Sequence, residues 1–488
     1  MVSTKNVAII GSGIAGIATA IRLANKGYEV DVYEKNSYPG GKLSHFEIND
    51  FQFDAGPSLF TQPENVEELF RICGETTSQY FNYTAVNIAC RYFFESGKVV
   101  NAYVDNQKFA DELKEKLGEN PDNVIKYLND ARKSYDSIGV IFLDFSLHKI
   151  KTFFQWRIFK AFANTKLSYL VSSMHDYNEN AFDKKETIQI FNRFATYNGS
   201  NPYVAPAMLT MIPHLEQNQG TYYPVGGMIS ITKALYQLAT KQGVKFHFGK
   251  AVASIHLKNN SVHALSVDNK VMTYDKVVSN MDVYYTYKNL LNQPEKAQKV
   301  LQQERSSSAV IFYWGIQGKF DQLHLHNICF SSDYKAEFDN IFIKKTISED
   351  PTIYINITSK MEASQAPAGC ENWFVMVNAP HDDGQDWDDW VKKCRKNVIQ
   401  KLNRILATDL ENMIVAEDVL NPKMIEVNTS SYTGSLYGTS SNSLFAAFFR
   451  HPNFARKIQN LYFVGGSVHP GGGIPLCLKS AKIAAEMI

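Results

Sequence analysis

Residues Asn6 to Gly16 read N-V-A-I-I-G-S-G-I-A-G and are the most informative part of the chain about its fold. Its apolar half is typical of a buried strand, and the glycines that follow are typical of a tight turn. The next residues, Ile17 to Lys26, have the spacing of a helix, and Glu29 to Glu34 alternate like a second strand. This order predicts a βαβ unit, and therefore an α/β protein with a Rossmann-like dinucleotide-binding domain.

The glycine turn predicts a phosphate site. Gly11, Gly13 and Gly16 have the spacing G-x-G-x-x-G between the predicted strand and helix. Because glycine has no Cβ, the backbone there can approach a pyrophosphate at the helix N-terminus. The spacing alone also occurs in turns that bind no nucleotide. Glu34 favours a nucleotide, since a carboxylate about 20 residues beyond the glycines can accept hydrogen bonds from a ribose hydroxyl.

Two further loops favour a flavin over NAD. Pro39 to Lys42 read P-G-G-K, and Phe53 to Ser58 read F-D-A-G-P-S. An NAD enzyme has no need of such loops. A flavin enzyme must also cover a ribityl chain and a ring system, for which glycine loops supply backbone donors without bulky walls.

Composition limits the other classes of function. The chain has 488 residues, which suggests two to four domains, and its 50 basic and 49 acidic residues give no reason to expect a nucleic-acid partner. Its six cysteines have no metal-ligand spacing, so we expect no metal site and a reducing, cytoplasmic location. No run approaches the roughly 18 apolar residues of a membrane span, so any membrane contact is expected to be peripheral.

The predicted nucleotide-binding elements are dispersed along the chain. A helix is expected over Met228 to Lys241, and short strands over Val244 to Phe248, Lys276 to Ser279 and Leu461 to Val464. The segments between them are rich in tyrosine and phenylalanine, as in the strand expected at Val310 to Ile316. We therefore predict an FAD-binding domain made of residues 1–83, 215–283 and 453–488, with an α+β substrate domain inserted as residues 84–214 and 284–452.

From its first strand to its last helix, the chain resembles the carotenoid desaturases of the phytoene desaturase type, within the flavin amine-oxidase-like superfamily. The motifs that carry the resemblance are G-S-G-I-A-G at Gly11 to Gly16, G-G-K at Gly40 to Lys42, D-A-G-P-S at Asp54 to Ser58, Y-P-V-G-G at Tyr223 to Gly227, V-V-S-N-M-D at Val277 to Asp282 and N-L-Y-F-V-G-G-S-V-H-P-G-G-G-I-P at Asn460 to Pro475. The last motif is the most specific of them.

The resemblance implies FAD as the cofactor and a set of residues that hold it. The implied cofactor residues are Gly11, Gly13, Ile14, Ala15, Gly16, Glu34, Lys35, Gly41, Lys42, Gly56, Pro57, Ser58, Val252, Gly466 and Ile474. Lys42 departs from the arginine that is common in the family, which keeps the charge but loses the planar fork. Pro475 is suited to the first turn of a helix, expected to extend to Ile488, whose positive end can face the flavin.

The resemblance also implies a reaction. The segments Gly434 to Gly438 (G-S-L-Y-G) and Ala446 to Arg450 (A-A-F-F-R) look most like the 1-hydroxycarotenoid 3,4-desaturases, which dehydrogenate the end of an acyclic carotenoid. A phytoene-type desaturase, a carotene isomerase and a non-enzymatic prenyl-lipid carrier remain as alternatives. The final electron acceptor, oxygen or a quinone, is left open. The catalytic residue is also left open, and the polar candidates for it are His148, His175, Arg193 and His469.

A basic and aromatic segment predicts contact with a membrane surface. Between Ile141 and Tyr169 the only acidic residue is Asp144. The aromatic residues are Phe142, Phe145, Phe153, Phe154, Trp156, Phe159 and Phe162, interleaved with His148, Lys149, Lys151, Arg157, Lys160 and Lys166. Such a stretch can lie among lipid headgroups, with its rings in the acyl boundary. The alternative is a buried helix pair with solvated lysines.

Overall fold

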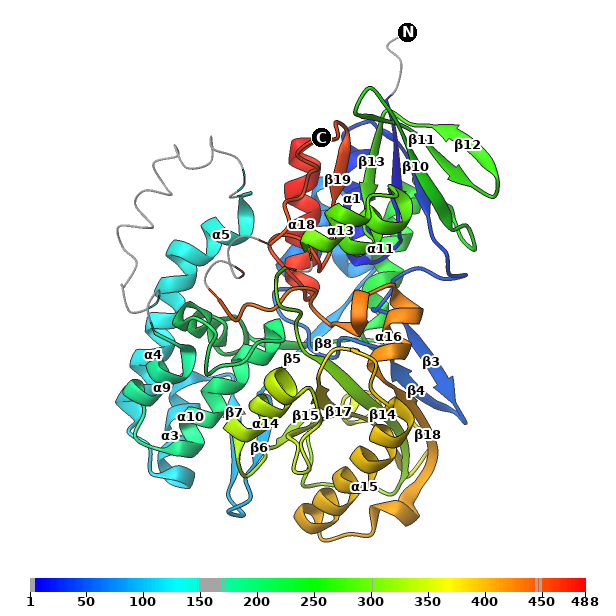
Figure 1. Ribbon diagram of the computed structural model, residues 1–488. Coiled ribbons are helices and arrows are strands. Elements are labelled where there is room, and N and C mark those ends of the chain that lie inside the picture. The colour runs from blue at the N-terminus through cyan, green and yellow to red at the C-terminus, as the bar shows by residue number, and fades with distance from the viewer. Residues whose placement is uncertain are drawn as a thin grey trace.

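The computed structural model describes residues 5–146, 148, 169, 172–300, 302–443, 446 and 450–488. Figure 1 shows two main parts, one built around a parallel sheet near both termini and the other around a larger sheet below it. The two parts are connected several times, because the chain passes repeatedly between them.

The first part is a five-stranded parallel sheet with the order β19-β13-β1-β2-β9. Its strands are β1 (Asn6–Ile10), β2 (Glu29–Tyr33), β9 (Lys245–His247), β13 (Lys276–Ser279) and β19 (Leu461–Phe463). Beside it, helix α1 (Ile14–Asn25) packs against both α11 (Ile229–Lys241) and α18 (Ile474–Met487). Strands that are buried on both faces consist almost entirely of apolar residues, as Val7 to Ile10 of β1 do.

The predicted helix over Ile17 to Lys26 begins three residues earlier than expected, at Ile14. Gly16 therefore lies inside the first turn of α1. A Cβ at this position would stand 2.2 Å from the backbone oxygen of Gly11, so the missing side chain is what lets the helix follow the turn so closely. The predicted strand at Val244 to Phe248 is shorter than expected, and spans only Lys245–His247.

The second part is a seven-stranded sheet with the order β18-β14-β17-β16-β15-β6-β7. Its strands are β6 (Ile88–Phe93), β7 (Val99–Tyr103), β14 (Ser308–Gln317), β15 (His326–Cys329), β16 (Ile353–Asn356), β17 (Cys370–Ala379) and β18 (Ile414–Leu420). All neighbours are antiparallel except β15 and β6. Val310, Phe312 and Trp314 pack on one face with the long helix α15 (Trp387–Leu406), so alternate residues of β14 face the other way.

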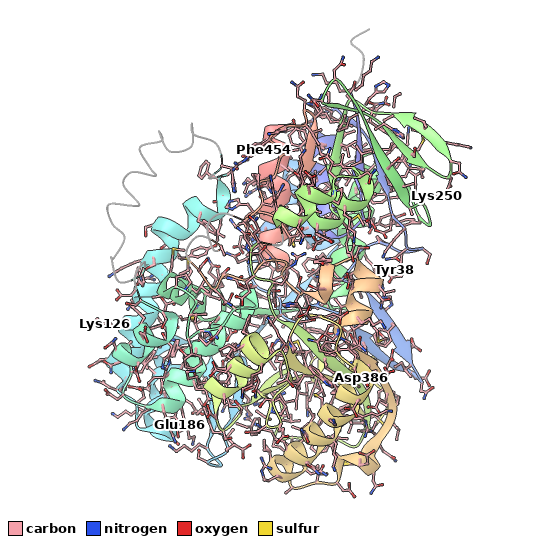
Figure 2. All side chains as sticks on the ribbon, viewed as in Figure 1. Tyr38, Lys126, Glu186, Lys250, Asp386 and Phe454 are labelled. Carbon is pink, nitrogen blue, oxygen red and sulfur yellow. The ribbon has the colours of Figure 1, made fainter. Side chains whose placement is uncertain are left out.

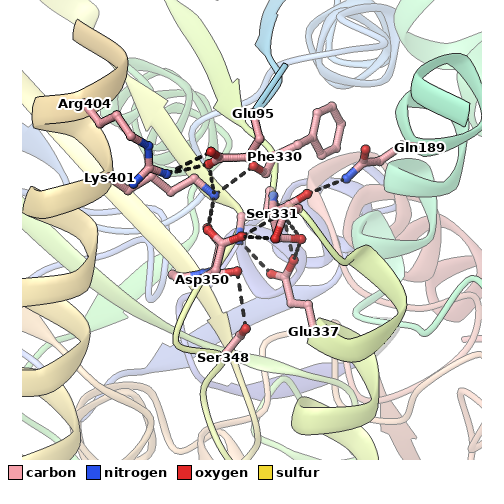
Figure 3. A network of polar contacts seen from close by, with 12 residues as sticks. Glu95, Gln189, Phe330, Ser331, Glu337, Ser348, Asp350, Lys401 and Arg404 are labelled. Atoms are coloured by element: carbon pink, nitrogen blue, oxygen red, sulfur yellow. Dashed lines mark hydrogen bonds and ion pairs between the residues drawn. The ribbon is translucent and has the colours of Figure 1, made fainter. Parts of the chain in front are cut away.

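A buried lysine ties α15 to this sheet, as Figure 3 shows. Lys401 is 3% exposed, and its Nζ donates to the backbone oxygens of Phe330 (2.8 Å) and Pro351 (3.1 Å). It also pairs with Asp350 at 2.6 Å. A buried charge with this many partners stabilises only the arrangement that satisfies it, so the network fixes how the helix lies on the sheet.

Helices α3 (Asn106–Leu117), α4 (Pro121–Ser134), α9 (Met174–Ala181) and α10 (Lys185–Asn192) gather on one side of the second sheet in Figure 1. The other α-helices of the described ranges are α2 (Glu64–Ile72), α5 (Val140–Asp144), α12 (Val283–Tyr285), α13 (Pro294–Val300), α14 (Tyr334–Asp339) and α16 (Pro422–Thr429). A small sheet contains β10 (Val252–Lys258), β11 (Ser261–Val267) and β12 (Lys270–Thr273).

Two pairs of strands connect the parts. β3 (His45–Ile48) and β4 (Phe51–Asp54) form a hairpin whose Phe51 and Phe53 pack in one core with Ile311 and Tyr313 of β14. β5 (Tyr83–Val86) pairs with β8 (Thr221–Pro224). The domain division given above stays a prediction. At these two pairs of strands, segments assigned to different predicted domains pair or pack with each other.

Most of the predicted membrane segment, from Ile141 to Tyr169, lies outside the described residues. Within it the structure describes 141–146, 148 and 169. Among the helices of the described ranges, none is both long and apolar enough to cross a bilayer.

Candidate cofactor and substrate cavity

A cavity of about 850 Å³ lies between the two parts. All of the predicted cofactor residues except Gly16 line it, although they come from distant segments of the chain. Tyr38 and Lys250, labelled in Figure 2, belong to the same wall. The volume is within the range of ligand pockets, roughly 300–1,000 Å³.

Two helices begin at this cavity without a side-chain cap. Gly13 precedes α1 and Gly473 precedes α18, and neither helix start has a side-chain hydrogen bond to its first N–H groups. Both glycines line the cavity. A Cβ on Gly473 would meet nothing within 4 Å, so this glycine faces open space. Free N–H groups at a helix start attract negative charge, and two such starts suit a ligand with two electron-rich regions.

One asparagine holds the glycine turns together. The Nδ2 atom of Asn280 lies 2.6 Å from where a Cβ of Gly13 would be, and its Oδ1 lies 2.7 Å from the corresponding position on Gly465. Asn280 follows β13, which lies between β1 and β19 in the sheet. The first and last glycine turns of the chain therefore both pack on the same side chain.

Glu34 is held in place by its own turn. Its Oε2 accepts hydrogen bonds from the Ser12 backbone N–H (2.8 Å) and the Ser12 hydroxyl (2.9 Å), and its Oε1 accepts one from the Asn36 N–H (2.9 Å). The carboxylate is therefore fixed on the cavity wall, with acceptor capacity remaining on Oε1. Lys35 also lines the cavity, but its ammonium already has partners in the protein. It donates to the backbone oxygen of Val427 and to the hydroxyl of Ser430 at the end of α16.

Two buried cations add positive charge to the wall. Lys42 donates to the backbone oxygen of Leu436 at 3.0 Å, and burial lowers the pKa of its ammonium to about 8. Arg450 is 2% exposed and donates to the backbone oxygen of Tyr437 at 2.8 Å, and burial lowers the pKa of its guanidinium to about 10. Among the described residues no carboxylate lies within ion-pair distance of either group. The Asp282 carboxylate partly offsets the charge of Lys42, whereas none of the described carboxylates does so for Arg450. Because a buried cation is costly unless it is compensated, both groups favour an anionic ligand.

The space and the charge of this cavity match what FAD requires of a binding site. The glycine turns leave room for a ligand at the backbone, the two helix starts offer N–H groups, and Lys42 and Arg450 supply positive charge. FAD carries an anionic pyrophosphate and a ring system that gains negative charge when it is reduced, so the residues present fit it. Sequence reasoning did not single out Arg450 as a cofactor residue, because its position on the cavity wall depends on contacts between distant segments of the chain.

A polar cluster lies on the face of the seven-stranded sheet that lines the cavity. Arg193, from the end of α10, donates to both carboxylate oxygens of Glu216 at 2.9 and 3.1 Å and to the Tyr92 hydroxyl at 2.8 Å. Tyr197 also donates to Glu216. Nearby, the Ser58 and Tyr354 hydroxyls lie 2.8 Å apart, and Tyr354 lies 2.8 Å from Nδ1 of His326.

Of the four polar candidates from the sequence, only Arg193 lines the cavity. Nε2 of His469 donates to the backbone oxygen of Phe145 at 2.9 Å, and burial lowers the pKa of this histidine to about 3. His175 bonds to Asn192 and lines a separate cavity of about 270 Å³. Burial lowers the pKa of His148 to about 4, and this residue does not line the main cavity. His326 and Glu216 were missed because each is isolated in the sequence.

Comparison with known proteins agrees with this geometry. The model of the family "flavin containing amine oxidoreductase" matches residues 14–488. The chain is 50% identical to a 1-hydroxycarotenoid 3,4-desaturase of Flavobacterium sp. (strain P99-3), covering 99% of both chains. It is 32% identical to a 4,4'-diaponeurosporene oxygenase of Staphylococcus haemolyticus (strain JCSC1435), covering 100% of this chain and 97% of the relative.

Among solved structures, an oxidoreductase from Methanosarcina mazei superposes with a TM-score of 0.65 at 14% identity, covering 99% of this chain and 100% of that one. At that identity the likeness concerns the fold alone. The predicted α/β class with an FAD-binding, Rossmann-like fold is confirmed, as are the flavin-dependent oxidoreductase activity and FAD as its cofactor. The chain belongs to the flavin-containing amine oxidoreductase family.

Proposed function

We propose that this protein is an FAD-dependent carotenoid desaturase that removes two hydrogens from the C3–C4 bond of an acyclic 1-hydroxycarotenoid. The observation that carries the proposal is the cavity itself, which continues from the glycine turns onto an apolar and aromatic sheet face. Ile311 and Tyr313 of β14 and Phe374 and Met376 of β17 line this part. The name of the 50% identical relative supplies the substrate class.

We also propose which part of FAD each group of cofactor residues contacts. Gly11 and Gly13 bind the pyrophosphate, Glu34 accepts hydrogen bonds from the adenosine ribose, and Gly41 and Lys42 lie on the flavin side. The loop from Gly56 to Ser58 and the start of α18 hold the flavin ring. FAD supplies the two-electron acceptor that no amino-acid side chain provides. The residues of the chain position the substrate and exclude water.

We further propose that the protein binds peripherally to the cytoplasmic face of a membrane through 141–169. Phe142 and Leu143, at the beginning of this segment, line the cavity, and Asp144 is held by an ion pair with Lys479 of α18. The segment therefore starts at the cavity wall, where a water-insoluble polyene would have to enter. Oxygen or a membrane quinone then takes the electrons from the protein.

Vesicle sedimentation tests the membrane proposal. Replacing Phe153, Phe154 and Trp156 with serine should reduce binding to anionic vesicles, and high salt should weaken wild-type binding, because each basic residue near the surface contributes about 1 kcal/mol. The matched control replaces three exposed apolar residues elsewhere, Ile343, Val415 and Val427, with serine. Equal loss in both variants would exclude the segment as the binding site.

The reaction is tested with the purified, FAD-loaded protein and carotenoids in liposomes. We expect a product lighter by two hydrogen atoms, with visible absorption at longer wavelength because the polyene gains one conjugated double bond. A product of unchanged mass would indicate an isomerase or a carrier. A product that gains oxygen would indicate the chemistry named for the staphylococcal relative. Strong preference for phytoene would overturn the assigned bond while leaving the flavin site in place.

A further inference from the structure

The cavity contains one buried histidine whose outer nitrogen has no partner. His326 lies on β15, is 2% exposed and lines the cavity. Its Nε2 makes no hydrogen bond to any described residue and has essentially no contact with solvent. Buried polar atoms in folded proteins nearly always have partners, so this atom requires an explanation.

The neighbours of His326 decide which ring nitrogen carries the proton. Asn356, directly opposite on β16, donates from Nδ2 to the backbone oxygen of Leu325 at 3.2 Å, which fixes the orientation of its amide. The same Nδ2 lies 3.1 Å from Nδ1 of His326. Because an amide nitrogen can only donate, Nδ1 is the acceptor.

The imidazole is also neutral. Burial, and then the nearby Arg193 guanidinium, lower the pKa of His326 to about 3. A neutral imidazole has one N–H group, and since Nδ1 accepts, that group is on Nε2. His326 therefore presents a fixed, buried N–H donor that needs an acceptor.

Most of the other polar groups of this region are already engaged, although the Nε atom of Arg193 also has no hydrogen-bond partner among the described residues. Arg193 and Glu216 bind each other, and Tyr197 donates to Glu216. Tyr354 lies between Ser58 and His326 and is hydrogen-bonded to both. Nε2 of His326 differs from Nε of Arg193 because it belongs to an uncharged ring outside the Arg193–Glu216 ion pair, so a neutral ligand can satisfy it without disturbing that pair.

The sheet register shows where this donor lies relative to the apolar wall. Met376 of β17 is paired with Tyr354 of β16, and Tyr354 is paired with Ile328 of β15. On this face most side chains of β14 and β17 are apolar or aromatic, whereas Tyr354 and His326 add polar groups beside the apolar Ile328. A long apolar molecule with a single hydroxyl at its end matches such a surface.

We propose that Nε2–H of His326, held by Asn356 and Tyr354, binds the oxygen of the terminal hydroxyl group and so determines the preference for a 1-hydroxycarotenoid. This inference rests on the proposed function. Only C2 separates the hydroxyl-bearing carbon from the bond that reacts, so the hydroxyl must bind beside the flavin. Ser58, in the loop that we assign to the flavin, is joined to His326 through Tyr354 alone.

The test compares two substrates that differ only in the terminal hydroxyl group. The FAD-loaded wild-type protein receives an acyclic carotenoid with a tertiary 1-hydroxyl group, or its counterpart with hydrogen there, in phospholipid vesicles. We expect the wild type to prefer the hydroxylated substrate in kcat/KM, and His326→Phe to reduce that preference by about tenfold or more, since the hydroxyl loses its donor. His326→Gln, which restores an amide N–H, should recover part of it.

The matched control is His214→Phe. His214 is also a buried histidine whose Nδ1 lies beside an asparagine amide, but it does not line the cavity. This variant should keep the wild-type preference. Bound FAD and the flavin absorption spectrum are measured in every variant.

Each result has one meaning. If His326→Phe lowers the kcat/KM of both substrates equally, or alters FAD content or the flavin spectrum, the histidine serves the fold or the cofactor and the inference is wrong. If the wild type desaturates both substrates equally well, the inference is wrong but the proposed function stands. If the wild type desaturates neither, both are wrong.

Discussion

The amide of Asn280 occupies the space that a side chain on Gly13 would need, with Nδ2 only 2.6 Å from the position of that Cβ. Gly13 has φ −63° and ψ 167°, so its backbone is open to any residue. Glycine is therefore needed at this position for two reasons. A larger residue would collide with the side chain of Asn280, which follows β13, and it would also fill space that a ligand needs.

This contact gives the first prediction. Gly13→Ala should lower the free energy of unfolding by about 1–3 kcal/mol, as an extra methyl does in a tightly packed site. Asn280→Ala in the same chain should recover part of the loss, because it removes the atom that clashes. Urea unfolding of the two single variants and the double variant, all without FAD, measures the coupling. Additive losses would show that the contact does not set the requirement.

The second prediction concerns Glu34. Glu34→Gln should weaken FAD binding by about tenfold, because a charge-assisted acceptor of the ribose hydroxyl is lost and the amide adds a donor beside the Ser12 N–H. Glu29→Gln, an exposed change at the start of the same strand, is the control. Titration of the apoprotein followed by flavin fluorescence gives both affinities. An unchanged dissociation constant for the Glu34 variant would remove this residue from the site.

The third prediction uses the pKa of Lys42, which burial lowers to about 8. FAD binds the ammonium form more tightly, so its affinity should fall as the pH rises above about 8. Lys42→Arg should abolish this pH dependence, because arginine stays charged. Lys42→Met should weaken binding at neutral pH and also make it independent of pH in this range. Isothermal titration at several pH values checks the prediction, and the same slope in all three proteins would contradict it.

The fourth prediction concerns Asp54, whose carboxylate accepts hydrogen bonds from the N–H groups of Met228 (3.0 Å) and Ile229 (3.3 Å) at the start of α11. Burial raises its pKa from 3.8 to about 6. The folded state thus binds more protons than the unfolded state between these values, and this group's contribution to stability falls as the pH rises from about 4 to 6.

Asp54→Asn removes that titration while keeping an oxygen acceptor. Its free energy of unfolding should therefore improve relative to wild type between about pH 4 and pH 6, then stay level. Asp54→Ala removes the acceptor too, and should cost about 0.5–2 kcal/mol. Guanidinium unfolding at several pH values, analysed as differences between variants, tests both statements. A constant difference between the asparagine variant and wild type would show that Asp54 does not titrate in this way.

The βαβ unit and the glycine turns follow from the residue pattern alone, and the resemblance of the motifs adds the flavin and the family. These features depend on neighbours in the chain: Gly11, Gly13 and Glu34 lie within one supersecondary unit, and Gly466 and Ile474 lie within one continuous motif. Periodicity and spacing record such local geometry directly. The beginning of α1 was misplaced because Gly16 is usually a poor helix residue, and only its contact with Gly11 explains why it lies in the first turn.

The contacts among His326, Asn356, Tyr354 and Ser58 arise only in the folded chain, as does the burial of Arg450 away from every carboxylate of the described ranges. These relationships come from strand register and from contacts between distant segments, and a one-residue change of register would turn His326 to the other face of the sheet. An isolated histidine in a sequence gives no sign of which partner fixes its proton. The cofactor could therefore be predicted from local patterns, whereas the donor that we assign to the substrate depends on the packing of the whole sheet.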